Sequence, residues 1–111
     1  MAHEEQRPNV EDMHLSFNET YGALQGAAEL LEPYAASFTG GTDAEVVDVL
    51  EVLGAARNMT IAGVRTAALY AHFHHGMSAR KIASIAELSN RTVSLWIAQA
   101  SNPRAGTTEN R

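Results

Sequence analysis

Apolar residues recur along most of the chain at three- and four-residue steps, which is the spacing of one face of an α-helix. The first row of them has a seven-residue period and comprises Val10, Phe17, Leu24 and Leu31. This row predicts one long helix over residues 10–31, with Asn9 as its N-cap. Pro33 is expected to kink or end that helix, because proline lacks the backbone N–H that a helix interior uses.

Two further helices are expected in the middle of the chain. Thr42 and Glu45 have the spacing of a capping box and predict a second helix that ends near Arg57. A third is expected over residues 59–75, with Gly76 as the residue that ends it. Two short helices follow, over residues 79–86 and 90–98, each behind a serine that can cap it. Since no alternating β-branched segment occurs, the predicted fold is all-α with about five helices.

The overall net charge of −5 conceals an uneven distribution. Residues 1–56 contain one basic and eleven acidic side chains, whereas residues 57–111 contain seven basic and two acidic ones. Charges in solution act over only about 8–10 Å at ordinary salt, so the C-terminal half can attract a polyanion while the N-terminal half stays away from it. The alternative is that the acidic and basic halves of the chain only form solvent-exposed surfaces without a binding role.

The last two predicted helices contain a recognisable set of positions. They are Gly76-Met77-Ser78, Arg80, Ile82-Ala83, Ala86, Leu88-Ser89, Thr92-Val93, Ser94 and Trp96-Ile97. This set resembles the helix-turn-helix of bacterial and phage regulators, and of the related domains of resolvases and transposases. The resemblance covers about forty residues when the preceding helix is included. Many members have glycine where this chain has Glu87, so the corner is where we expect a departure from the family's turn.

The resemblance implies that the second short helix lies in the major groove of double-stranded DNA. The expected base contacts come from the side of that helix opposite the core: Asn90, Arg91, Ser94, Leu95 and Ala98. The expected phosphate contacts come from hydroxyl and basic groups near the two helix starts: Ser78, Arg80, Lys81, Ser89 and Thr92.

A single module of this kind makes few contacts, and such proteins usually bind DNA as dimers. The expected surface for a homodimer, or for packing between the two halves of the chain, combines the long first helix with the second apolar face of the third: Val10, Phe17, Tyr21, Leu24, Leu31, Leu69, Tyr70 and Phe73. The acidic N-terminal helices are an alternative surface for a different protein partner.

Other classes of function find little support in the residues. The chain has no cysteine, and no third ligand at fixed spacing accompanies His72 and His75, so neither a metal site nor a cofactor is expected. No catalytic motif occurs, and we expect no enzymatic activity. The absence of a leader or a long apolar run leads us to expect a cytoplasmic protein without a membrane segment.

The resulting prediction divides the chain into a disordered arm (residues 1–8), an acidic helical region (9–57), a DNA-binding domain (58–98) and a flexible tail (99–111). The predicted function is that of a small sequence-specific transcriptional regulator or repressor. Two alternatives remain open: a DNA-packaging or partition adaptor, and a helical interaction protein such as an antitoxin or inhibitor that does not bind DNA.

Overall fold

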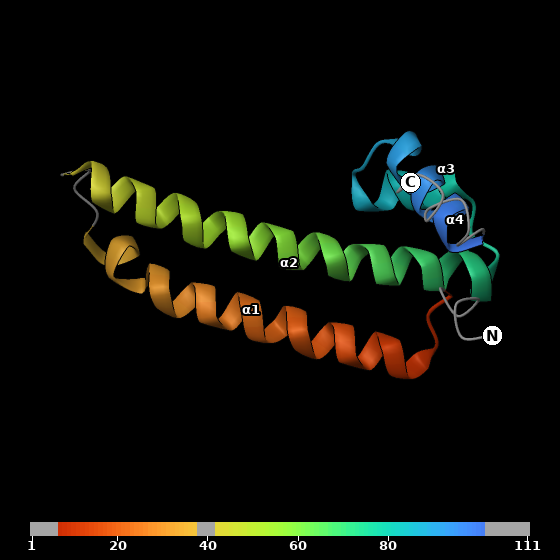
Figure 1. Cartoon of the computed structure of the whole chain (residues 1–111), viewed down its shortest axis with the longest axis horizontal. Coiled ribbons are helices and arrows are strands. Elements are labelled where there is room, and N and C mark those ends of the chain that lie inside the picture. Colours follow the sequence, from red (N-terminus) through yellow and green to blue (C-terminus); the bar gives the residue numbers. More distant parts are fainter. Residues whose placement is uncertain (1–6, 38–41, 102–111) are drawn as a thin grey trace, which may run out of the picture. The chain divides into compact units, whose positions relative to one another are not determined.

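The computed structural model describes residues 7–37 and 42–101, and within these ranges every regular element is a helix. The predicted all-α class is therefore confirmed. The four helices are α1 (Val10–Ser37), α2 (Asp43–His75), α3 (Ala79–Ala86) and α4 (Asn90–Ser101), as drawn in Figure 1. The prediction of about five helices was one too many.

The difference lies in α2, which passes without interruption through the break predicted at residues 57–58. No proline or glycine occurs there, so nothing removes a backbone hydrogen bond or favours a turn. The Thr60 hydroxyl donates to the carbonyl of Ala56 at 2.8 Å, which satisfies the side chain without breaking the helix. The predicted second and third helices are consequently one helix of 33 residues.

Helix α1 is also longer than predicted, because it continues past residue 31 and through Pro33 to Ser37. The proline removes one backbone donor but leaves the carbonyls of the turn available, and Ser37 Oγ donates to the Pro33 carbonyl at 3.2 Å. At the other end, the backbone N–H of Asp12 donates to Asn9 Oδ1 at 2.8 Å, and the Asn9 N–H donates to Asp12 Oδ2 at 2.9 Å. The predicted cap at Asn9 is thus present as a reciprocal pair.

The chain forms two compact units, and the borders between them lie inside α1 and α2. The hairpin unit comprises the described residues of 16–63, and the C-terminal unit comprises residues 7–15 and 64–101. The predicted border at residue 57 lies within the hairpin unit.

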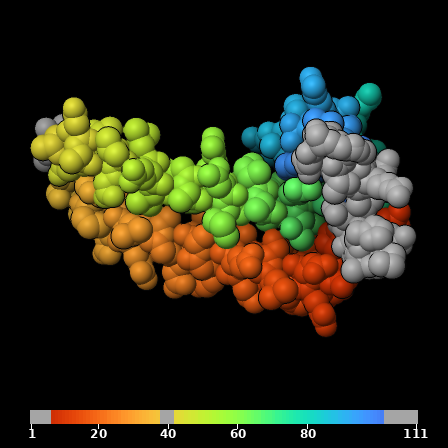
Figure 2. All heavy atoms as spheres, viewed as in Figure 1, coloured from red at the N-terminus to blue at the C-terminus, as the bar shows by residue number. Residues whose placement is uncertain are grey.

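The hairpin unit consists of the antiparallel parts of α1 and α2 (Figure 1), whose atoms meet along the hairpin (Figure 2). Near the connection, the Tyr34 hydroxyl donates to Asp48 Oδ2 at 2.9 Å. That hydrogen bond is the main reason that the pKa of Tyr34 is raised. Towards the other end the helices approach closely, because a Cβ at Gly63 would lie 2.5 Å from Thr20 Oγ1.

The C-terminal unit contains a small core formed by Ala68 of α2, Ile82 and Ala83 of α3, and Val93 of α4. Partly buried apolar side chains surround it: Ala71, Met77, Ala79, Leu88, Trp96 and Ile97. Residues 7 and 8 belong to this unit and contradict the predicted disordered arm at those positions. Pro8 is buried, and its carbonyl accepts a hydrogen bond from His74 Nε2 at 2.8 Å. Residues 1–6 lie outside the described residues.

Helix α2 ends as predicted at Gly76, whose φ of +66° is left-handed. The Gly76 N–H donates to the His72 carbonyl at 3.1 Å, and the Met77 N–H donates to the Ala71 carbonyl at 3.2 Å. These bonds satisfy carbonyls that the helix itself leaves without partners. The turn therefore depends on a backbone conformation that glycine adopts without strain.

Replacing Gly76 by alanine is expected to lower the free energy of unfolding by about 1 kcal/mol. The cost arises from the backbone alone, because a Cβ there would meet nothing within 4 Å. Thermal unfolding followed by circular dichroism measures it. Gly22→Ala is the matched control, since Gly22 lies inside α1 with equally open space and should raise stability by about 0.5–1 kcal/mol. Shifts of the same sign in both variants would contradict this account.

Candidate nucleic-acid interface

Helices α3 and α4 begin at the two predicted serine caps. Ser78 Oγ accepts the backbone N–H of Lys81 at 3.1 Å, and Ser89 Oγ accepts that of Thr92 at 3.0 Å. The Ser89 and Thr92 hydroxyls also lie 2.8 Å apart and share a hydrogen bond. Each cap satisfies a donor that the first helical turn leaves unpaired, and therefore determines where the helix begins.

The corner between the two helices has three residues, Glu87 to Ser89. Glu87 adopts the left-handed conformation, with φ 59° and ψ 47°, and its N–H donates to the Ala83 carbonyl. The Leu88 N–H donates to the same carbonyl at 2.9 Å, and the Leu88 side chain packs on the core. The expected departure at this corner is wrong: the chain makes the left-handed turn that favours glycine with a glutamate in place.

Glu87→Gly is accordingly expected to stabilise the C-terminal unit by about 1 kcal/mol, because glycine adopts a positive φ without the steric cost that a Cβ brings. Urea unfolding monitored by the fluorescence of Trp96, the chain's only tryptophan, reports on this unit directly. Glu87→Gln removes the charge and keeps the Cβ, so it should leave stability nearly unchanged. A gain as large in the glutamine variant would assign the effect to charge instead.

The inner side of α4 is apolar and anchors the helix. Val93 is completely buried and Ala100 is buried, while Trp96 and Ile97 pack against the same core. The burial of Ala100 and the helical state of residues 99–101 correct the predicted flexible tail at these positions. Residues 102–111 of that tail lie outside the described residues.

Each of the predicted base contacts on α4 is exposed: Asn90, Arg91, Ser94, Leu95 and Ala98. Arg91, Leu95 and Ala98 lie close to the side opposite Val93, because each position advances the helix by about 100°. Ser94 lies at the edge of this outer side, and Asn90 is the first residue of the helix. Helix α4 contains no acidic residue, so nothing on it would repel a polyanion.

The predicted phosphate contacts lie around the two helix starts. Ser78, Arg80, Lys81 and Ser89 are exposed, and Thr92 is partly buried. Ser78 and Ser89 already accept a backbone N–H as caps, so their hydroxyls have less capacity for a ligand than Arg80 and Lys81. Among the five predicted phosphate contacts, Arg80 and Lys81 are therefore the side chains best suited to bind an anion.

The predicted interface residues separate into two sets. Val10, Phe17, Tyr21 and Leu24 are exposed, and Leu31 is half-buried. Leu69 is buried within the chain, whereas Tyr70 and Phe73 are half-buried. Tyr70 stacks on His74 with ring centroids 4.4 Å apart. These last three residues lie in the C-terminal unit, and their predicted role in a dimer or in packing between the two halves of the chain stays a prediction.

Sequence reasoning missed the contacts of Arg7 and Pro8. The Arg7 guanidinium lies over the Phe73 ring, 4.5 Å from its centroid, and Pro8 is joined to His74. It also missed Ile85, which is exposed on α3. The Arg-Pro pair before the helix cap was the available signal for the contacts of Arg7 and Pro8. It did not indicate a partner for Pro8 that lies 66 residues away along the chain.

Two other properties concern the described part of the chain. No three histidine, aspartate or glutamate side chains gather there as ligands of a metal ion would. His72 Nδ1 instead donates to the Met77 carbonyl at 2.9 Å. None of the described helices has the length and apolar character needed to cross a membrane.

Comparison of the chain with protein-family models, with curated proteins and with solved structures found no match.

Proposed function

We propose that the protein is a small cytoplasmic transcriptional regulator that binds a specific sequence of double-stranded DNA through α4. The observation that carries the proposal is the two-sided character of this helix. Val93 and Ala100 hold one side in the core, and the other side exposes residues that can contact base edges. An α-helix of this kind fits the width of the major groove.

The exposed residues on α4 suit direct readout of bases. The Arg91 guanidinium can donate two hydrogen bonds to guanine O6 and N7, and the Asn90 amide can pair with adenine. Leu95 and Ala98 offer apolar surface to a thymine methyl group. Together they would distinguish sequences, whereas basic residues alone would only hold the backbone.

Arg80 and Lys81 supply the second requirement, which is attraction to phosphates. They lie in the first turn of α3, next to the cap at Ser78. The helix N-terminus adds backbone N–H groups and the positive end of the helix dipole. These contacts would fix the position of α4 on the duplex without themselves reading its sequence.

The proposal is tested by selection from a random duplex library, followed by fluorescence anisotropy on the selected sequence across a salt series. We expect an enriched motif and a loss of affinity of roughly tens-fold between low and moderate salt, as a few phosphate contacts require. A scrambled duplex of equal length is the control. Failure to enrich any motif, together with affinity that does not change with salt, would favour a helical interaction protein that does not bind DNA.

A further inference from the structure

The hairpin unit lacks a core of its own. None of its described residues, 16–37 and 42–63, is buried. The less exposed positions form a seam between α1 and α2, and several of them are small: Ser16, Thr20, Ala23, Ala27, Ala56 and Thr60. Such side chains let the two helices approach but remove little apolar surface from water, so the seam alone provides little of the stabilisation that helices obtain from packing.

Most of the large apolar side chains of this unit are instead exposed. An exposed apolar set, which we call the hairpin face, comprises Phe17, Tyr21, Leu24, Val46, Leu50, Leu53 and Ile61. Their exposed fractions range from 39% for Ile61 to 68% for Tyr21. Solitary exposed apolar residues are common on protein surfaces, but seven of them along two neighbouring helices indicate an interaction surface.

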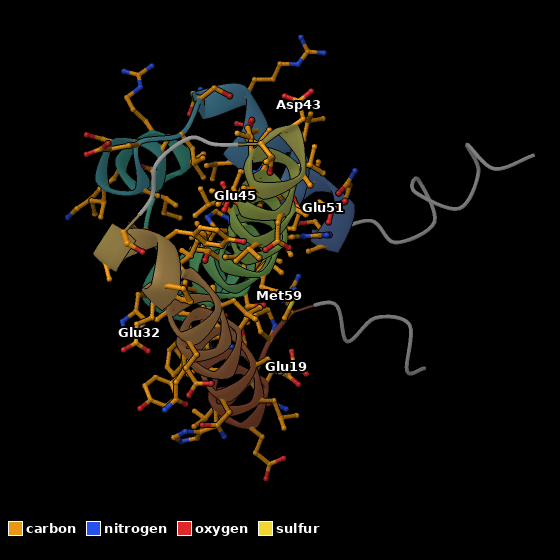
Figure 3. All side chains as sticks on the ribbon, turned by 90° about the vertical axis from the view of Figure 1, so that its left-hand side faces the viewer. Glu19, Glu32, Asp43, Glu45, Glu51 and Met59 are labelled. Atoms are coloured by element: carbon orange, nitrogen blue, oxygen red, sulfur yellow. The ribbon has the colours of Figure 1, made fainter. Side chains whose placement is uncertain are left out.

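Helical geometry places this set on one side of the hairpin. Every member follows a seam residue by one position: Phe17 follows Ser16 on α1, and Leu53 follows Val52 on α2. One position corresponds to a rotation of about 100°. Because α1 and α2 run antiparallel, the same rotation turns both rows towards the same side. Glu19, Glu51 and Met59 lie on the opposite side in Figure 3.

We propose that a second copy of this chain binds the hairpin face, so that two hairpins form a four-helix bundle. Both rows have the alternating four- and three-residue spacing of bundle interfaces, at residues 17, 21 and 24 and at residues 46, 50 and 53. This proposal does not rest on DNA binding.

The available area approaches that of a standard complex. With roughly 150–200 Å² for a large side chain, seven side chains that are about half exposed offer on the order of 500–700 Å². A standard complex buries about 800 Å² on each partner, whereas the largest patch on a typical monomer is about 300–600 Å². Neighbouring atoms at the rim would supply the remainder.

Charge placement also permits two copies to meet. The hairpin unit contains seven acidic residues and one basic one, Arg57, so two copies would repel if carboxylates faced each other. On α1, Glu32 follows the seam residue Leu31 and lies on the side away from Glu19, Glu51 and Met59 in Figure 3, so it continues the α1 row beyond Leu24. On α2, Arg57 follows the seam residue Ala56 and is the one charged side chain between Val46 and Ile61 on that row. Each hairpin face therefore has one acidic and one basic side chain, and two copies can associate with opposite charges available to pair.

The requirement for a core favours a second copy over a different protein. Helix α2 has 33 residues, of which only Ala68 and Leu69 are buried, so it needs a partner from the time of synthesis. Another copy of the chain is the one partner that is always present in equal amount. Association would bury apolar area on all four helices at once, which explains why the large side chains lie outside the hairpin seam rather than within it.

Single-cysteine variants test this directly, because the chain has no cysteine of its own. Position 53 is near the middle of the hairpin face. A two-fold axis that relates two such faces passes near their middle in either orientation of the copies, so the two cysteines of a Leu53→Cys dimer would be close together. Glu51→Cys lies on the opposite side (Figure 3). With a short flexible bismaleimide we expect at least about tenfold more cross-linked dimer from Leu53→Cys. Equal yields from the two variants would overturn the proposal.

Sedimentation equilibrium of the full chain without DNA provides the second measurement. The unmodified chain should be a dimer at micromolar concentration, and its melting temperature should rise with concentration because association stabilises the folded state. Leu53→Glu should raise the dimer dissociation constant by roughly 100-fold, since a carboxylate would lose its water. Met59→Glu, on the opposite side of α2, should leave it unchanged. A fully helical unmodified chain that stays monomeric up to about 100 µM would overturn the proposal and assign the face to another protein; either result is independent of DNA affinity.

Discussion

Val93→Ala is expected to lower the free energy of unfolding of the C-terminal unit by about 2–3 kcal/mol. Val93 has no exposed surface and lies among Ala68, Ile82 and Ala83. Removing its two methyl groups loses about 0.8 kcal/mol of transfer free energy for each. The cavity left behind adds to this loss, because neighbouring helices relax only partly. Urea unfolding monitored by the fluorescence of Trp96, which packs on this core, measures the effect.

Leu95→Ala is the matched control for this prediction. Leu95 is only two residues away on α4 but is 49% exposed, so its truncation should change stability by less than about 0.5 kcal/mol. If the two variants lose similar stability, then α4 does not pack in the way its burial indicates.

Arg91→Ala is expected to weaken binding to the selected DNA sequence by about 1–3 kcal/mol and to reduce discrimination at one base position. Arg91 is exposed on the outer side of α4, so stability should be retained. Arg91→Lys keeps the charge but lacks the planar pair of donors, and should recover little of the lost specificity. Anisotropy titrations against the selected duplex and its single-base variants measure both quantities.

Two further variants separate base reading from phosphate binding. Lys81→Ala should weaken binding about equally for all sequences and reduce the salt slope by about one. Gln99→Ala changes an exposed residue of α4 that lies outside the predicted base contacts and should have little effect on affinity. An Arg91→Ala variant that binds the selected duplex as tightly as the unmodified chain would contradict the assigned role.

The local signals in the sequence were sufficient for the C-terminal helices. The predicted range 79–86 is the observed α3, and the predicted α4 begins at the observed residue. Both results rest on interactions between near neighbours: the caps at Ser78 and Ser89 and the left-handed turn at Gly76. Such bonds span a few residues, so their residue types are sufficient to predict them.

Packing between distant segments could not be predicted from the sequence in the same way. The lack of proline and glycine at residues 57–58 permitted a continuous α2 but did not require it, and nothing local indicated that Pro8 would be held by His74. Among the hairpin glycines, Gly63 of α2 meets a side chain of the other helix, whereas Gly22 and Gly26 of α1 face open space. These outcomes depend on contacts between segments that are distant in sequence.

Periodicity and capping act within a few residues, so the helical class of the chain, the positions of its caps and the apolar side of α4 could be predicted from residue types. Which apolar rows are covered depends on how the helices pack against one another. The row through Phe17 and Leu24 could equally have filled a core inside the chain. It stays exposed because the small side chains of α1 and α2 form the seam, and their close approach turns the large ones outward.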